Sequence, residues 1–181
     1  FVVICVLGIL FNCLTFWKSR TTRKRGTSTT RLSLSLLCVM AGADTACLVA
    51  FLFMLSMRYM GIANTMFLRY TCKVQLFVIH SASAFSIYCW LVLSLVRYVA
   101  VFCPFKHLRI HKQPHQAVFL LALVICLLQS WLLYDVDYNR EFRACMSELE
   151  PNVERKIQIA EIIFSYFIPL VVITICDVKV I

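Results

Sequence analysis

Five long apolar stretches constrain this sequence more than any of its other features. They cover residues 1–17, 32–57, 74–96, 116–134 and 157–176. Asp44 and Glu161 are the only Asp, Glu, Lys or Arg residues inside them. A helix needs about 20 mostly apolar residues to cross a hydrocarbon core about 30 Å thick. Four stretches meet that length and the first is slightly short, so the sequence predicts an all-α membrane protein.

Composition excludes an ordinary soluble domain. The sequence is 61% hydrophobic and 15% charged, whereas soluble domains have about 25% charged and about 45–50% apolar residues. The formal net charge of +9 also occurs in nucleic-acid-binding proteins, but basic residues beside apolar spans are a topology signal in membrane proteins. We therefore expect the lipid bilayer as a partner, and no nucleic acid.

Both ends of the sequence lie in apolar segments. The first stretch opens without a methionine and without the basic leader of a signal peptide, and the chain stops within "VITICDVKVI". We therefore expect a truncated first span, and a sequence that is a fragment of a larger membrane protein.

Basic residues between the stretches predict the orientation in the membrane. The segment after the first stretch carries six and no acid: Lys18, Arg20, Arg23, Lys24, Arg25 and Arg31. Connections one and three together hold nine basic residues against seven in connections two and four. Because cytoplasmic loops are enriched in Lys and Arg, we expect connections one and three inside and the amino terminus outside.

An arginine, Arg97, directly follows the third stretch at its inner end. Cys72 and Arg97 are 25 residues apart, which is about 37 Å of helix, so a membrane can separate them, with Cys72 outside. On position alone, Arg97 is an interfacial arginine whose charge reaches the headgroups.

The residues around Arg97 favour a second interpretation. "VRYVAVFCPFKH" resembles the Asp-Arg-Tyr segment and following loop of rhodopsin-like G-protein-coupled receptors. The resemblance extends along the chain through Gly8 and Asn12 in "GILFNCLTF", "LSLSLLCVMAGAD" ending at Asp44, Cys72 with Lys73, Cys145, and Pro169 in "FSYFIPL". Their order, and the spacing from Cys72 to Arg97, make the combination specific.

The resemblance implies a seven-transmembrane-helix bundle in the plasma membrane. Residues 1–181 would form a partial receptor domain with five helices, at about 1–17, 32–57, 72–102, 116–134 and 157–181. It implies a signalling receptor rather than an enzyme, in which an extracellular ligand shifts the equilibrium between helix arrangements. Arg97 and Tyr98 would then couple to a heterotrimeric G protein, and the loop with Pro104 and Phe105 would pack on it.

Three positions depart from the family pattern. Val96 stands where the family has an acid before the arginine. Trp131 lies too far toward the outside to be the fourth-helix tryptophan. The resemblance assigns Pro169 to a kink in the fifth helix. Asp177 replaces the tyrosine expected two turns after Pro169.

Polar residues inside the spans are candidates for a buried site. The resemblance implies that Asp44 and Ser86, with Asn12 as a polar neighbour, bind a sodium ion, and no other cofactor is expected. The alternative is a protonated carboxyl that packs and hydrogen-bonds. His80 has no second ligand at helical spacing, so it favours pocket lining or packing over metal binding.

The ten cysteines divide by location. Under the expected topology, Cys72 and Cys145 are the two in outside segments, where disulfides are permitted, and we expect them to be bridged. The remaining cysteines are expected to be small apolar fillers: Cys5, Cys13, Cys38, Cys47, Cys89, Cys103, Cys126 and Cys176.

The ligand class follows from the third helix and the fourth connection. In monoamine receptors an aspartate binds the amine, and its matching position here is Ile79. The expected ligand pocket comprises Leu76, Ile79, His80 and Ser83. The acidic residues of segment 135–156 suit a larger, partly basic ligand such as a peptide. "STTRLSLSLLCVMAGADTACLV" resembles invertebrate neuropeptide receptors of the FMRFamide type.

The sequence leaves two alternatives to a neuropeptide receptor open. One is a chemosensory receptor for small odorants, which belongs to the same class of fold. The other is a transporter fragment with Asp44 as an ion-coupling site, although transporters more often show paired helices broken by Gly or Pro.

Overall fold

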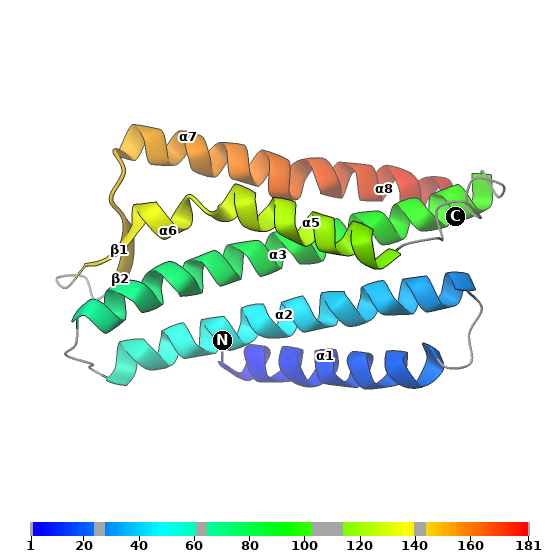
Figure 1. Ribbon diagram of the computed structural model, residues 1–181, viewed down its shortest axis with the longest axis horizontal. Helices are drawn as coiled ribbons and strands as arrows, with labels where there is room; N and C mark the ends of the chain where they lie inside the picture. Colours follow the sequence, from blue (N-terminus) through cyan, green and yellow to red (C-terminus); the bar gives the residue numbers. More distant parts are fainter. Residues whose placement is uncertain (1, 24–27, 61–64, 103–113, 140–143, 181) are drawn as a thin grey trace.

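The computed structural model is a bundle of helices with a small β-hairpin at one end (Figure 1). It describes residues 2–23, 28–60, 65–102, 114–139 and 144–180. The elements are α1 (Val2–Arg23), α2 (Ser28–Met60), α3 (Thr65–Phe102), α5 (Pro114–Gln129), α6 (Leu132–Asp135), β1 (Val136–Asn139), β2 (Ala144–Ser147), α7 (Pro151–Ile162), η1 (Ile163–Phe167) and α8 (Ile168–Val180).

Five helical segments in the described part of the chain are long and apolar enough to cross a membrane. They are Val2–Thr22, Arg31–Met57, Thr65–Phe102, Val118–Asp135 and Pro151–Val180. Successive spans run in opposite directions (Figure 1). The all-α membrane fold expected from the apolar stretches is thus confirmed, with the hairpin as an addition.

The central element is α3. It packs against α2, α5, α6, β1, η1 and α8, while α1 packs against α2. A Cβ atom at Gly8 would lie 2.8 Å from a methyl group of Leu48, so the glycine permits the close approach of α1 and α2.

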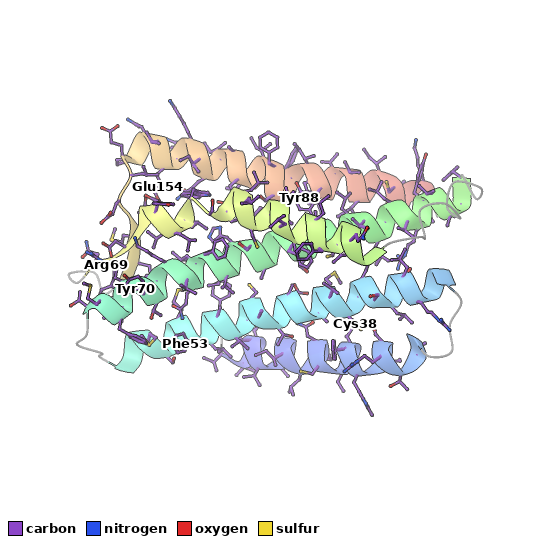
Figure 2. All side chains as sticks on the ribbon, viewed as in Figure 1. Cys38, Phe53, Arg69, Tyr70, Tyr88 and Glu154 are labelled. Atoms are coloured by element: carbon purple, nitrogen blue, oxygen red, sulfur yellow. A yellow bond between two sulfur atoms is a disulfide. The ribbon has the colours of Figure 1, made fainter. Side chains whose placement is uncertain are left out.

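Large apolar side chains project outward along the bundle (Figure 2). Trp17, Val3 and Phe119 are 70–72% exposed, whereas the polar Ser94, Gln129 and Asp135 are buried. A soluble protein shows the opposite distribution, so this surface fits a lipid environment.

The helices extend beyond the ranges expected from hydropathy. α1 continues to Arg23, α3 begins at Thr65 and α7 begins at Pro151. Hydropathy marks the hydrocarbon core alone, whereas a helix can continue through the headgroup region because its backbone is already hydrogen-bonded. Pro151 suits a first helical position, where no N–H group is needed.

We expected one helix over 116–134 for the fourth span, and that expectation is wrong. A turn at Ser130 and Trp131 separates α5 from α6. The Ser130 hydroxyl and N–H both donate to the Leu127 carbonyl, at 2.8 Å and 3.3 Å. Such local bonds from serine compete with helix continuation.

The segment expected to be a long loop contains the hairpin. β1 and β2 pair antiparallel, with Val136 opposite Ser147 and Tyr138 opposite Cys145. We call this end of the bundle the hairpin end, and the other end the Arg97 end. The start of α1 is the end of that helix nearer the hairpin end, and α8 ends toward the Arg97 end (Figure 1).

The fifth span contains a π-helical turn, η1, directly before Pro169. The Ile168 N–H bonds to the Ile163 carbonyl, five residues back. Proline has no N–H and its ring crowds the preceding turn. The wider turn therefore lies at the position where the sequence predicted a kink at Pro169.

Candidate functional site

A cavity of about 520 Å³, here called the hairpin cavity, lies beneath the hairpin between α3, α6 and α7. Its lining includes Leu76, His80, Trp131, Asp135, Met146, Ser147, Glu154, Gln158, Glu161 and Tyr166. Ligand pockets in proteins typically enclose about 300–1,000 Å³, so the volume suits a drug-sized molecule or the end of a peptide.

A disulfide between Cys72 and Cys145 ties the hairpin to α3, as expected, with 5.6 Å between the Cα atoms. Leu132 and Val136 pack against Cys72 in a small buried cluster. The hairpin is therefore held over the end of the bundle.

Asp135 anchors the hairpin from the end of α6. Its carboxylate accepts hydrogen bonds from the Ser147 hydroxyl at 2.8 and 2.9 Å, the Glu148 N–H at 3.2 Å and the Leu149 N–H at 3.0 Å. The side chain is buried, and these donors offset the cost of burying the charge. The sequence showed an acidic residue here, but not this role.

A second anchor joins α3 to β1. The Arg69 Nε donates to Asp137 Oδ1 at 2.7 Å, and Arg69 lies at the hairpin end (Figure 2). Desolvation acts to raise the pKa of Asp137, but the Tyr138 N–H, the Glu148 side chain and the Arg69 guanidinium outweigh it. The pKa of this carboxyl therefore lies below its ordinary value.

His80 and Glu161 connect the third and fifth spans across the hairpin cavity. His80 Nδ1 lies 2.6 Å from Glu161 Oε1, and the Glu161 side chain is only 9% exposed. The sequence favoured pocket lining or packing for His80, and in the structure His80 lines the hairpin cavity with Glu161 as its partner. Glu161 was visible in the sequence as a charge in an apolar stretch, but the pairing was not.

One face of α7 presents polar groups to the hairpin cavity. Glu154, Gln158 and Glu161 are four and three residues apart, so they lie on the same side of the helix, and all three line the cavity. The Gln158 amide donates to Glu154 at 2.7 Å. With Asp135, the lining contains three carboxylates, and among its described residues it contains no Lys or Arg.

The four residues expected in the ligand pocket divide into two groups. Leu76 and His80 line the hairpin cavity. Ser83 lies deeper, where its hydroxyl accepts a hydrogen bond from Tyr166 at 3.4 Å. Ile79 is buried, and its carbonyl faces the Cys47 thiol of α2 at 3.9 Å. Ile79 is not among the residues that line the hairpin cavity.

At the Arg97 end, Arg97 is exposed near the end of α3. No described carboxylate forms an ion pair with it. The ring of Tyr98 packs against that of Phe102, with centroids 4.6 Å apart. Pro104 and Phe105 lie outside the described residues.

The three residues expected to hold a sodium ion come from α1, α2 and α3. Asp44, Ser86 and Asn12 are all half-buried, and Asp44 is close enough to Cys89 of α3 for an electrostatic interaction. A carboxylate and a hydroxyl are hard oxygen donors of the kind that hard cations take. No group of three or more His, Cys, Asp or Glu side chains suitable for a metal occurs in the described ranges.

Comparison with known proteins places these features in a family. The model of the 7 transmembrane receptor (rhodopsin family) matches residues 11–181. The chain belongs to this family. A Caenorhabditis elegans protein described as "Probable G-protein coupled receptor AH9.4" is 37% identical over 111 residues, a match that covers 60% of this chain and 30% of the relative.

Membership of this family establishes the general architecture of the chain. The five spans are part of a seven-helix bundle that crosses the plasma membrane several times. The family comprises signalling receptors rather than enzymes. The hairpin cavity and Arg97 lie toward opposite ends of the bundle, and α3 runs between them.

Proposed function

We propose that this chain is the amino-terminal five-helix part of a receptor for a neuropeptide of the FMRFamide type, with a basic side chain that binds in the hairpin cavity. The ligand arrives at the hairpin end, which faces outside. Binding shifts the equilibrium between helix arrangements, and the Arg97 end then activates a heterotrimeric G protein.

The acidic lining of the hairpin cavity carries this proposal. Asp135 is already saturated by the hairpin, so Glu154 and Glu161 are the carboxylates available to a ligand. Their present partners are Gln158 and His80, which a guanidinium can replace with stronger, charge-assisted bonds. A neutral odorant could not form such charge-assisted bonds with Glu154 and Glu161.

The experiment compares ligand charge with receptor charge. Full-length receptor is treated with Phe-Met-Arg-Phe-amide and with the analogue in which uncharged citrulline replaces arginine, and G-protein activation is measured. We expect wild-type receptor to need about tenfold more of the citrulline peptide. Glu161→Gln should reduce that difference, because the variant no longer distinguishes the charge.

Glu150→Gln is the matched control, because Glu150 is exposed at the start of α7 and does not line the hairpin cavity. It should leave the difference between the two peptides unchanged. Equal potency of both peptides on wild-type receptor contradicts a basic-group pocket. Activation by neutral odorants, with none by the peptide, supports the chemosensory alternative.

We also propose that Asp44 and Ser86 hold a sodium ion that favours the inactive arrangement. The half-buried carboxylate of Asp44, with no hydrogen bond to a described residue, supports this. Asp44→Asn should remove the sodium dependence of peptide binding, measured with choline as the replacement cation. Unchanged dependence in that variant would favour a packing role instead.

A further inference from the structure

Of the four histidines in the sequence, only His80 precedes Arg97. The other three are His107, His111 and His115. Under the orientation expected from the basic connections, those three lie toward the cytoplasm. Histidine is the side chain whose ordinary pKa, about 6.5, lies closest to physiological pH. A change in the pH outside the cell can therefore change the charge of His80 while the other three keep theirs.

The contact of His80 with Glu161 leaves one ring nitrogen for a proton. His80 Nδ1 lies 2.6 Å from Glu161 Oε1. An ionised carboxylate only accepts hydrogen bonds, so the neutral ring carries its hydrogen on Nδ1, and Nε2 takes up a further proton. The His80 side chain is 35% exposed and lines the hairpin cavity. Water in that cavity can therefore deliver the proton to Nε2.

The other titratable groups that face His80 in the hairpin cavity belong to types that change charge at a different pH. The described lining holds Asp135 from α6, Glu154 and Glu161 from α7, and Tyr166 from η1, and it contains no residue of α2, α5 or α8. Carboxyl groups ordinarily titrate near about pH 4 and tyrosine near about pH 10. Between about pH 5 and about pH 8, histidine is therefore the residue type in this lining that ordinarily changes its charge.

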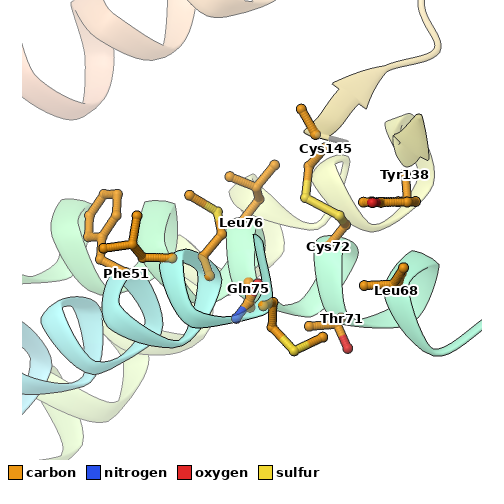
Figure 3. Close-up of a pocket in the computed structure, with 12 residues that line it drawn as sticks. Phe51, Leu68, Thr71, Cys72, Gln75, Leu76, Tyr138 and Cys145 are labelled. Atoms are coloured by element: carbon orange, nitrogen blue, oxygen red, sulfur yellow. A yellow bond between two sulfur atoms is a disulfide. The ribbon is translucent and has the colours of Figure 1, made fainter. Parts of the chain in front are cut away.

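The neighbouring cavity presents no such group. It has a volume of about 350 Å³, lies between α2, α3 and the hairpin, and shares Leu76 and Cys145 with the hairpin cavity (Figure 3). Its described lining contains no His, Asp, Glu, Lys or Arg. Of the two cavities, the hairpin cavity is therefore the one in which a proton from outside finds a basic group.

On the basis of the peptide function proposed above, we propose that His80 and Glu161 form a proton-binding site through which acid outside the cell opposes the binding of a basic ligand. When protonated, His80 is a cation that holds Glu161 by a charge-assisted hydrogen bond, about twice as strong as a neutral one. A ligand guanidinium must then displace a cation, rather than a neutral ring, from the carboxylate. The Glu161 side chain is 9% exposed, so water and salt screen this competition weakly.

Peptide potency at two external pH values tests the competition. Cells with the full-length receptor are treated with Phe-Met-Arg-Phe-amide at about pH 7.5 and about pH 5.5, and G-protein activation is measured. For one proton that competes with the ligand at an ordinary histidine, the potency should be about tenfold lower at the acidic pH. The citrulline analogue has the same terminal amine but no guanidinium, so its potency should change less.

His80→Gln is the matched variant. Glutamine can still donate a hydrogen bond to Glu161 but takes up no proton in this range, so the potency of the arginine peptide should be nearly the same at both pH values. Glu161→Gln should also reduce the pH effect, and it decides the case if His80→Gln fails to reach the surface. Glu150→Gln, at an exposed acid that does not line the hairpin cavity, should keep the full effect. All variants are compared at equal surface level.

A second measurement needs no ligand. The rate of hydrogen exchange at the ring carbon between the two nitrogens of a histidine depends on protonation of the ring, and mass spectrometry assigns it to single residues. In full-length receptor in lipid nanodiscs, we expect the exchange of His80 to show a titration between about pH 5 and about pH 8.

Two results would overturn the proton-binding site. One is an exchange of His80 without a titration in that range. The other is an equal loss of potency at acidic pH in wild type and His80→Gln. A peptide that fails to activate the receptor at either pH, while His80 shows the expected titration, overturns the peptide function and not the proton site.

Discussion

The Tyr88 hydroxyl of α3 donates a hydrogen bond to the Phe164 carbonyl of η1 at 2.8 Å. That carbonyl is available because Ile168, its usual helical partner, bonds instead to Ile163. The next residue, Pro169, has no N–H to offer. The third span thus supplies the donor that the π-helical turn of the fifth span lacks.

We predict that Tyr88→Phe destabilises the receptor by about 1 kcal/mol, because the variant removes one neutral hydrogen bond and keeps the ring. Thermal unfolding of the purified full-length receptor measures the effect. Tyr70→Phe is the control, since Tyr70 is 68% exposed and should change nothing. Equal melting temperatures for wild type and Tyr88→Phe would show that the bond contributes no stability.

The Arg69–Asp137 contact predicts a pH dependence for the docking of the hairpin. The pKa of Asp137 is lowered in the folded receptor. The contribution of its carboxylate to folding stability is therefore fully present above the ordinary aspartate pKa. It is lost as the pH falls through the lowered value, below about pH 4. The contribution should be less than about 1 kcal/mol, because Arg69 is half exposed.

Asp137→Asn should therefore lower the melting temperature slightly and equally from pH 5 to pH 8, and the difference from wild type should shrink at lower pH. Glu150→Gln, at the exposed acid just before α7, controls for the loss of one surface charge. A difference that instead grew below pH 4 would contradict the sign of this argument.

The orientation can be tested by glycosylation. Basic residues beside the first span predict that the connection from α1 to α2 is cytoplasmic. An Asn-X-Thr acceptor inserted between α2 and α3 should then be glycosylated in cells, and one inserted between α1 and α2 should not. The reverse pattern of gel shifts, removed by glycosidase, would invert the proposed topology.

Hydropathy predicted the number and order of the spans because lipid imposes length and apolarity on each helix. It could not predict the ends of α3 or α7, since helices continue into water on backbone hydrogen bonds alone. It also missed the hairpin, which depends on the long-range contacts of Asp135 with Ser147 and Leu149.

The resemblance directed attention to Cys72, Cys145 and His80, but not to the partner of His80. Glu161 is 81 residues away in the sequence, and no local pattern joins two such positions. The pair became visible only when the packing of α3 was known.

Arg97 offers the sharpest test of the proposed G-protein coupling. Lysine is also cationic and long, so it can replace an arginine that only anchors the helix at the interface. It cannot reproduce the planar set of donors that a coupling residue uses. Val96, unlike an acid, offers Arg97 no charge partner, and we therefore expect ligand-independent activity that Val96→Asp lowers.

Guanine-nucleotide exchange on a G protein, catalysed by full-length receptor at equal surface level, is the most direct test. We predict measurable basal exchange by wild type, a reduction of about tenfold or more in Arg97→Lys, and a reduction in Val96→Asp. Retained peptide binding in both variants would show that the receptors are folded. Exchange by Arg97→Lys equal to that of wild type would contradict the coupling role of Arg97, and with it the proposed signalling mechanism.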